Sequence, residues 1–316
     1  MKILLIAPLF YSYHKKIIAA LEERGFSVYS FNEIPIKSMA LYGFLQSYMP
    51  FLINTIWKLY NKKLEKCLGN GVTHVLIIRG YYLPHLVLEG IKRFDTIIKV
   101  IYYQWDSIQN NPNGLTVSKY ADSSYTFDRV DSLEYKQFKY LPLFNSNPPL
   151  ASTGNEDIDI LCVASWTKQR EITCMEVINS LSHHNIKSYI YWYLPVSTYL
   201  KLVLSRRLMV MKNIHIKPLN NQEYKILLSR ARSVIDSPSI SQSGISMRTI
   251  EALAQNKKVI TTNTNIIHDD FYDMNMVYCI GESRSIESFI KNDSYISDTA
   301  QKGLLSLDGW LERMGL

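Results

Sequence analysis

Hydrophobic and polar residues follow two different periods along this chain, one typical of buried strands and one typical of amphipathic helices. The apolar run Lys2–Ala7 is followed by a helical stretch, His14–Arg24, that Gly25 ends. A second apolar run, Phe26–Phe31, comes directly after that glycine. Strands separated by helices need crossover connections, which favour parallel sheets. The pattern therefore predicts an α/β fold.

The same alternation continues through the first half and restarts in the second. In the first half we expect a helical stretch at 41–68, strands at 73–79, 99–104 and 124–127, and a helix that Pro84 opens and that runs to Arg93. In the second half we expect strands at 158–164, 188–193, 214–218, 233–236, 258–262 and 276–280, and helices at 171–182, 196–210, 222–230 and from Arg284 and Ser297.

A segment rich in proline and small polar residues, Leu141–Asn155, interrupts the alternation in mid-chain and is typical of a domain linker. The length of 316 residues also suits two domains of about 150 residues. We therefore expect two Rossmann-like, doubly wound domains that face each other across a cleft. The predicted bounds are 1–150 and 151–300, followed by a C-terminal helix at 301–316 that returns to the first domain.

Composition narrows the function classes. With 47% hydrophobic residues the chain can bury full cores. We find no signal peptide and no apolar run of bilayer-spanning length, and the four cysteines show no metal-ligand spacing. Walker A, zinc-site and G-x-S-x-G patterns are absent as well. These features predict a cytoplasmic protein with reduced thiols and no bound metal.

The net charge of +7 calls for an anionic partner. Lysines are interleaved with apolar and aromatic residues along 51–66, and 199–208 shows a similar mixture. Such a helix could lie on an anionic membrane, or it could pack on its own domain with a solvated lysine face. The sequence leaves both interpretations open.

The segment Gln242–Ala254 carries the most specific chemistry. A loop of small residues around Gly244 leads into a helix, where free backbone N–H groups and the helix dipole suit a phosphate or diphosphate. Arg248 adds a cation, and Glu251, one turn further, could accept hydrogen bonds from a ribose diol. The alternative is a surface ion pair between Arg248 and Glu251 that contributes a few tenths of a kcal/mol.

The second half resembles the nucleotide-sugar domain of GT-B glycosyltransferases, in which a loop leads into a helix of this type. The wider pattern is similar to bacterial lipopolysaccharide and capsule glycosyltransferases of a CgeB-like type. The resemblance is carried, in chain order, by 103–107, 125–131, 140–144, 247–263, 270–272 and 307–311.

This resemblance implies that the second domain binds a nucleotide-sugar donor, expected to be a UDP- or dTDP-sugar, without a metal or other cofactor. Glu251 would bind the ribose, and Leu219 lies in the segment expected to hold the base. The expected diphosphate ligands are Ser243, Gly244, Ile245, Ser246 and Arg248, with Arg170, or Lys168 in its place, against the leaving diphosphate. Many retaining enzymes of this fold carry a glutamate where this chain has Ser243, so the stereochemistry stays open.

The first domain would hold the acceptor. Strand ends in open parallel sheets face the ligand crevice, which favours Asp106 as the general base. Asp128, His14 and Arg79 are the candidate acceptor-binding residues, with Arg79 suited to an acceptor phosphate. Each has a structural alternative: an aspartate after a strand often caps a helix, a histidine is common at a helix start, and an arginine can pair with a carboxylate.

The function expected from these features is transfer of a sugar to a lipid-linked or oligosaccharide acceptor in bacterial surface polysaccharide synthesis, as lipopolysaccharide, O-antigen or capsule. We expect the enzyme at the inner face of the cytoplasmic membrane, with no nucleic acid partner. Two alternatives remain. A nucleotide-sugar epimerase of GT-B architecture would use the same donor site, and a non-enzymatic nucleotide or nucleic-acid binder would need a basic stripe with exposed aromatic residues.

Overall fold

The computed structural model describes residues 1–316 except 10–12, 95–96, 150–155, 205–212, 239–241 and 293–298. The chain forms two compact units. Unit 1 comprises Met1–Ser146, Ile240–Gly244 and Leu307–Leu316, and unit 2 comprises Asn147–Ser239 and Ile245–Ser306. None of the described helices is long and apolar enough to cross a membrane.

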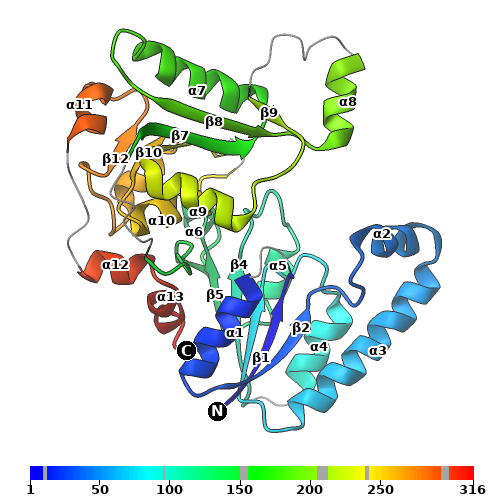
Figure 1. The fold of residues 1–316 in the computed structure, drawn as a ribbon. Helices are drawn as coiled ribbons and strands as arrows, with labels where there is room; N and C mark the ends of the chain where they lie inside the picture. The colour runs from blue at the N-terminus through cyan, green and yellow to red at the C-terminus, as the bar shows by residue number, and fades with distance from the viewer. Residues whose placement is uncertain (10–12, 95–96, 150–155, 205–212, 239–241, 293–298) are drawn as a thin grey trace. The chain divides into compact units, whose positions relative to one another are not determined.

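Unit 1 is built on a sheet of six parallel strands in the order β2-β1-β3-β4-β5-β6 (Figure 1). Its strands are β1 (Lys2–Ala7), β2 (Ser27–Asn32), β3 (His74–Ile78), β4 (Lys99–Gln104), β5 (Ser123–Thr126) and β6 (Phe138–Tyr140). Its helices are α1 (Tyr13–Glu23), α2 (Met39–Tyr48), α3 (Pro50–Leu68), α4 (His85–Phe94), α5 (Gly114–Ser118), α6 (Arg129–Glu134) and α13 (Leu307–Arg313).

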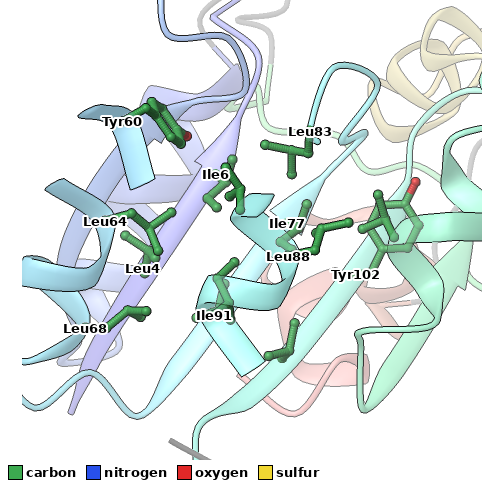
Figure 2. Close-up of a cluster of buried hydrophobic side chains, with 14 of the residues drawn as sticks. Leu4, Ile6, Tyr60, Leu64, Leu68, Ile77, Leu83, Leu88, Ile91 and Tyr102 are labelled. Atoms are coloured by element: carbon green, nitrogen blue, oxygen red, sulfur yellow. The ribbon is translucent and has the colours of Figure 1, made fainter. Parts of the chain in front are cut away.

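The core of unit 1 lies between the sheet and helices α3 and α4 (Figure 2). Leu4, Ile6 and Ile77 come from the strands, and Leu64 and Leu88 come from the two helices. The α3 residues that are buried recur at helical spacing, which places a single apolar stripe of that helix against the sheet. Burial of these side chains on one face of each helix fixes the layer order.

Unit 2 has a second sheet of six parallel strands, in the order β12-β11-β10-β7-β8-β9. Its strands are β7 (Ile158–Ser165), β8 (Ser188–Tyr193), β9 (Ile214–His215), β10 (Ala231–Asp236), β11 (Lys258–Thr261) and β12 (Val277–Cys279). Its helices are α7 (Lys168–Ser180), α8 (Val196–Leu204), α9 (Asn221–Arg230), α10 (Met247–Ala254), the 3₁₀ helix η2 (Thr264–His268), α11 (Ile286–Lys291) and α12 (Thr299–Leu305).

In both sheets the chain adds strands in one direction and then in the other. β1 has β2 on one side and β3 on the other, and β7 has β8 on one side and β10 on the other. With right-handed crossovers, such a reversal puts helices on both faces of each sheet. The predicted α/β class, with two doubly wound Rossmann-like sheets, is therefore confirmed.

Several element predictions differ from the structure. The predicted helical stretch 41–68 is two helices, because the chain leaves helical geometry at Met49 before Pro50. The predicted strand 214–218 stops at His215. Helices α5 and α6 and strand β6 are too short for periodicity to reveal. The end of the predicted helix 196–210 and the start of the one from Ser297 lie outside the described residues.

The last residues of the chain belong to unit 1. Trp310 is fully buried, and its ring centroid lies 4.7 Å from that of Tyr103 and 4.6 Å from that of Phe144. Arg24 donates from Nη1 to the carbonyl oxygen of Leu316 across 2.7 Å. The C-terminal segment thus completes the packing around β4.

Candidate functional site

In the sheet of unit 2, the chain adds strands on one side of β7 and then on the other, beginning with β10, so the strand order reverses between β7 and β10. In open α/β sheets, ligands bind outside the carboxyl ends of the strands at such a switch point. The segments that leave these two ends contain Arg170, which follows β7, and the start of α10, which follows β10. Topology alone therefore predicts a binding site at the carboxyl ends of β7 and β10.

Asp236, the last residue of β10, organises this edge. Its buried carboxylate accepts hydrogen bonds from the hydroxyls of Ser246, at 2.6 Å, and Thr249, at 2.9 Å. It also forms an ion pair with Arg248, with 2.7 Å between Oδ1 and Nη1. Ser246 caps α10 by accepting from the backbone N–H of Thr249. The first turn of α10 is thus attached to the end of the neighbouring strand.

Arg248 remains charged in this setting. Burial works against its charge, but the carboxylate of Asp236 holds the pKa of Arg248 above its usual value. About a quarter of its side chain, 26%, is exposed to solvent. The guanidinium is therefore oriented by an ion pair and still reachable by a ligand.

Arg170 spans the switch point. Its Nη1 donates to the carbonyl of Ser165 at the end of β7, across 3.0 Å, and its Nε donates to the carbonyl of Ser237 just beyond β10, across 2.9 Å. Burial and the nearby cation of Arg248 lower the pKa of Arg170, while Asp236 opposes this effect. Two guanidinium groups thus stand near the Asp236 carboxylate, and such groups can bind an anion through paired N–H donors.

Glu251 lies one turn beyond Arg248 on α10. Its Oε1 accepts a hydrogen bond of 3.1 Å from the side-chain amide of Asn147. Burial raises the pKa of Tyr224, a residue of α9 that also feels the charges of Arg248, Glu251 and Asp236. The Tyr224 hydroxyl is buried and has no hydrogen-bond partner among the described residues. It is thus a polar atom at this site with unused hydrogen-bonding capacity.

Two residues of this cluster escaped the sequence analysis. Asp236 had a usable signal, because it is a carboxylate at the end of a strand that precedes the small-residue loop. Tyr224 had none, because a tyrosine within a surface-type helical pattern gives no indication of what its hydroxyl meets.

The small-residue loop contributes less to an anion site than the sequence suggested. The backbone N–H groups of Ser243 and Gly244 donate to the carboxylate of Asp128, at 2.8 and 3.2 Å, and the Ser243 hydroxyl contacts the same group. A Cβ on Gly244 would lie 2.4 Å from the ring of Phe127. Ile245 is buried. The N–H groups of this loop are therefore already bound to a carboxylate of the protein. The glycine itself is needed because Phe127 leaves no room for a side chain.

Two further candidates show no link to the cluster among the described residues. Lys168 is exposed and pairs with Glu171 across 3.1 Å on the first turn of α7. Leu219 is partly buried in the connection between β9 and α9, just before Asn220, which caps α9 through a capping box with Glu223. Their assignment to donor binding stays a prediction.

Unit 1 has its own switch point between β1 and β3. Arg79 follows β3 with a left-handed backbone, at φ 67°, and its guanidinium pairs with the buried carboxylate of Glu33. Its carbonyl accepts from the Tyr102 hydroxyl and the Asn111 amide, both at 2.8 Å. A non-glycine residue in this conformation costs about 1–3 kcal/mol, and such strain is concentrated at functional sites.

Asp106 follows β4 and lies close enough to Arg79 for their charges to interact. Burial raises the pKa of the Asp106 carboxyl, and the cation of Arg79 opposes that rise. The structure thus brings these two predicted residues into one electrostatic cluster. A carboxylate with a raised pKa is a better proton acceptor than an ordinary aspartate, as a general base requires.

His14 lies in the first turn of α1, which follows β1 and so leaves the same switch point. Burial, with a smaller contribution from Lys15, lowers the pKa of the imidazole. Its Nδ1 is buried and has no hydrogen-bond partner among the described residues. His14 is therefore a neutral ring with hydrogen-bonding capacity left over.

Asp128 is a helix cap, the structural alternative to acceptor binding that the sequence offered. It caps α6 by accepting from the N–H groups of Val130 and Asp131, at 3.1 and 3.2 Å. The same carboxylate anchors the loop at Ser243 and Gly244, and only 2% of the residue is exposed. With five such contacts in the structure, Asp128 is engaged in holding segments of unit 1 together.

Comparison with known proteins supports the fold. The chain is similar to S. aureus MnaA, solved with UDP, with a TM-score of 0.52, 11% identity, and coverage of 99% of this chain and 95% of that one. It is also similar to sucrose-phosphate synthase from Thermosynechococcus elongatus, with a TM-score of 0.54, 12% identity, and coverage of 100% and 94%. No protein-family model and no curated protein matches the chain. At these identities the likeness shows the fold, which is GT-B.

Proposed function

We propose that this GT-B protein is a glycosyltransferase that uses a nucleotide-diphosphate sugar. The proposal rests above all on the pair of arginines at the β7/β10 switch point. Arg170 is held by two carbonyl oxygens and Arg248 by the Asp236 carboxylate, so both guanidinium groups are oriented. Glu251 stands one turn further along α10, at the spacing that suits a ribose diol beyond a diphosphate. The solved structure of MnaA with UDP is consistent with such a donor.

In the proposed reaction, the bond between the anomeric carbon and the donor phosphate oxygen breaks, and the electron pair leaves with the diphosphate. Arg170 and Arg248 would neutralise the charge that develops on that oxygen. A new bond forms between the anomeric carbon and an acceptor hydroxyl oxygen. The proton of that hydroxyl passes to a base, a role that we assign to Asp106.

Unit 1 is proposed to bind the acceptor, a lipid-linked or oligosaccharide intermediate of bacterial surface polysaccharide, as in CgeB-like enzymes of lipopolysaccharide, O-antigen or capsule synthesis. Arg79 and His14 follow two strands of its switch point, and they provide a guanidinium that is paired with Glu33 and a neutral imidazole. These groups suit a phosphate and a sugar hydroxyl respectively.

The test is a thermal-shift panel of UDP, dTDP, GDP and their sugars, followed by product analysis with the preferred sugar. A ligand that binds the folded state raises the melting temperature by mass action. We expect one diphosphate to raise it, and Arg170→Ala to lose that shift. Arg230→Ala is the matched control. Arg230 pairs with Asp157 and lies just before β10, at the end of that strand opposite to its carboxyl end.

Product analysis with the donor alone separates transfer from epimerisation, which would use the same donor site. Conversion of the donor to its epimer without an acceptor would replace the transferase assignment by that of an epimerase. The absence of a shift with every nucleotide, together with salt-sensitive polynucleotide binding, would instead support a nucleic-acid binder.

A further inference from the structure

The surface formed by α2 and the outer face of α3 is unusually apolar. Tyr42 is the one buried residue of α2, a helix that is described in full. It is held by edge contacts to the rings of Trp57, at 6.5 Å, and Tyr82, at 5.3 Å. The large side chains of this surface that face solvent are Met39, Leu41, Phe44, Tyr48, Met49, Phe51, Leu52 and Leu59, with exposures from 41% to 79%.

These side chains belong to two neighbouring helices. Helices α2 and α3 are consecutive, meet at Met49 and Pro50, and lie side by side in unit 1 (Figure 1). On α3, the residues that face the core are Ile53, Trp57, Tyr60, Asn61, Leu64 and Leu68. Phe51 and Lys62 are about three turns apart on the opposite side of the helix. A group of exposed large apolar side chains on two neighbouring helices is typical of an interaction site.

The positive charge of the same segment indicates that its partner is anionic. Residues 37–66, all described, contain five lysines, Lys37, Lys58, Lys62, Lys63 and Lys66, and one carboxylate, Glu65. All five lysines are exposed. An apolar patch rimmed by cations on one helix face is complementary to lipid headgroups of negative charge with acyl chains beneath them. A second copy of this chain would bring like charges together.

We propose that the α2–α3 surface docks on the surface of an anionic lipid bilayer. Phe44, Tyr48 and Phe51 insert at the level of the headgroups, and the lysines of α3 lie along the charged surface with their stems on the apolar side. The protein is thereby attached without crossing the membrane. This inference does not depend on the proposed reaction, since no donor or acceptor takes part in it.

Vesicle sedimentation of the full chain tests the proposal. We expect binding to phosphatidylcholine vesicles that contain about 30 mol% phosphatidylglycerol, weak binding to phosphatidylcholine alone, and loss of binding in about 0.5 M NaCl. Lys58→Ala with Lys62→Ala should weaken the partition by about thirtyfold. Phe51→Ser should weaken it by about tenfold.

The matched controls lie on α6 and near α5 of the same unit. Leu133→Ser removes an apolar side chain as exposed as Phe51, 77% against 79%, and Lys119→Ala with Lys136→Ala removes two exposed lysines elsewhere. Both controls should bind vesicles like the unchanged protein, and all variants should melt at similar temperatures. Equal weakening by the controls and the test variants would overturn the proposal. Concentration-dependent dimerisation that Phe51→Ser abolishes, without vesicle binding, would assign the surface to a second copy.

The readout also separates this proposal from the proposed function. Vesicle binding that persists in Glu251→Ala, with nucleotide binding lost, would show the two sites to be independent, as we expect. Nucleotide binding without any vesicle binding would remove the docking surface and leave the enzyme assignment in place.

Discussion

The carboxylate of Asp236 at the end of β10 holds the guanidinium of Arg248 in the first turn of α10, with 2.7 Å between Oδ1 and Nη1. Only 2% of the Asp236 side chain is exposed, so this ion pair is half desolvated. The same carboxylate binds Ser246 and Thr249. One aspartate therefore sets both the start of the helix and the direction of its arginine.

Asp236→Asn is expected to destabilise the fold by about 1–3 kcal/mol, because it leaves the Arg248 charge without its partner. Urea denaturation measures the loss. Asp308→Asn is the control, since Asp308 pairs with Arg24 across 3.4 Å with 71% of its side chain exposed, and should cost less than about 0.5 kcal/mol. Equal losses of unfolding free energy in the two variants would show that burial of the Asp236 ion pair does not increase its contribution to stability.

Glu251→Ala is expected to weaken binding of the preferred nucleotide by about tenfold to a hundredfold, because two ribose hydroxyls lose their acceptor. Titration calorimetry measures the dissociation constant. Glu176→Ala removes an exposed carboxylate of α7 and should leave binding unchanged. Undiminished binding in Glu251→Ala would exclude it from the donor site.

Asp106 predicts the pH dependence of turnover. A base works when deprotonated, and burial raises the pKa of Asp106, so turnover should rise with pH through a midpoint above the usual range of an aspartate. Arg79→Gln removes the cation that opposes this rise and should move the midpoint higher, whereas Arg79→Lys should keep it near the original value. Asp106→Asn should abolish turnover and keep donor binding. Normal turnover in Asp106→Asn would exclude Asp106 as the base.

Asp131 predicts a pH dependence of stability. Burial, with smaller contributions from neighbouring carboxylates, raises its pKa to about 6 against the hydrogen bond from Ile108. Between the unfolded value of about 4 and this folded value, the folded protein binds more protons, so stability falls as pH rises. Asp131→Asn should remove about 1–2 kcal/mol of that loss, measured by urea denaturation between about pH 4.5 and pH 7.5. Parallel pH curves for the two proteins would contradict this.

Gly244→Ala is expected to cost about 1–3 kcal/mol, because the new methyl would overlap the ring and carbonyl of Phe127, at 2.4 and 2.8 Å. Gly43→Ala is the opposite case on α2: nothing lies within 4 Å of the added carbon. It should gain about 0.5–1 kcal/mol from helix propensity. Thermal melts compare the two variants. A gain of stability in both variants would show that the packing around Gly244 accommodates the methyl.

The sequence predicted Arg248 and Glu251 on one helix because that relation is local: three positions along α10 put both side chains on one face. It also placed Asp106 and Arg79 at strand ends, where the parallel topology collects them. It could not find Asp236 as the partner of Arg248 or Glu33 as the partner of Arg79. Those contacts join segments whose spacing along the chain carries no periodic signal.

The sequence by itself determined the α/β class, because the alternation of apolar runs and helical periods dictates parallel strands with crossovers. It also placed Arg79 and Asp106 just after strands, where the structure has them. Only the tertiary structure decided which donors stay available. The N–H groups of Ser243 and Gly244 donate hydrogen bonds to the carboxylate of Asp128, which lies more than a hundred positions away along the chain. Because a hydrogen-bond donor is committed by whichever acceptor the fold brings within 3 Å or so, no local pattern could have assigned these groups.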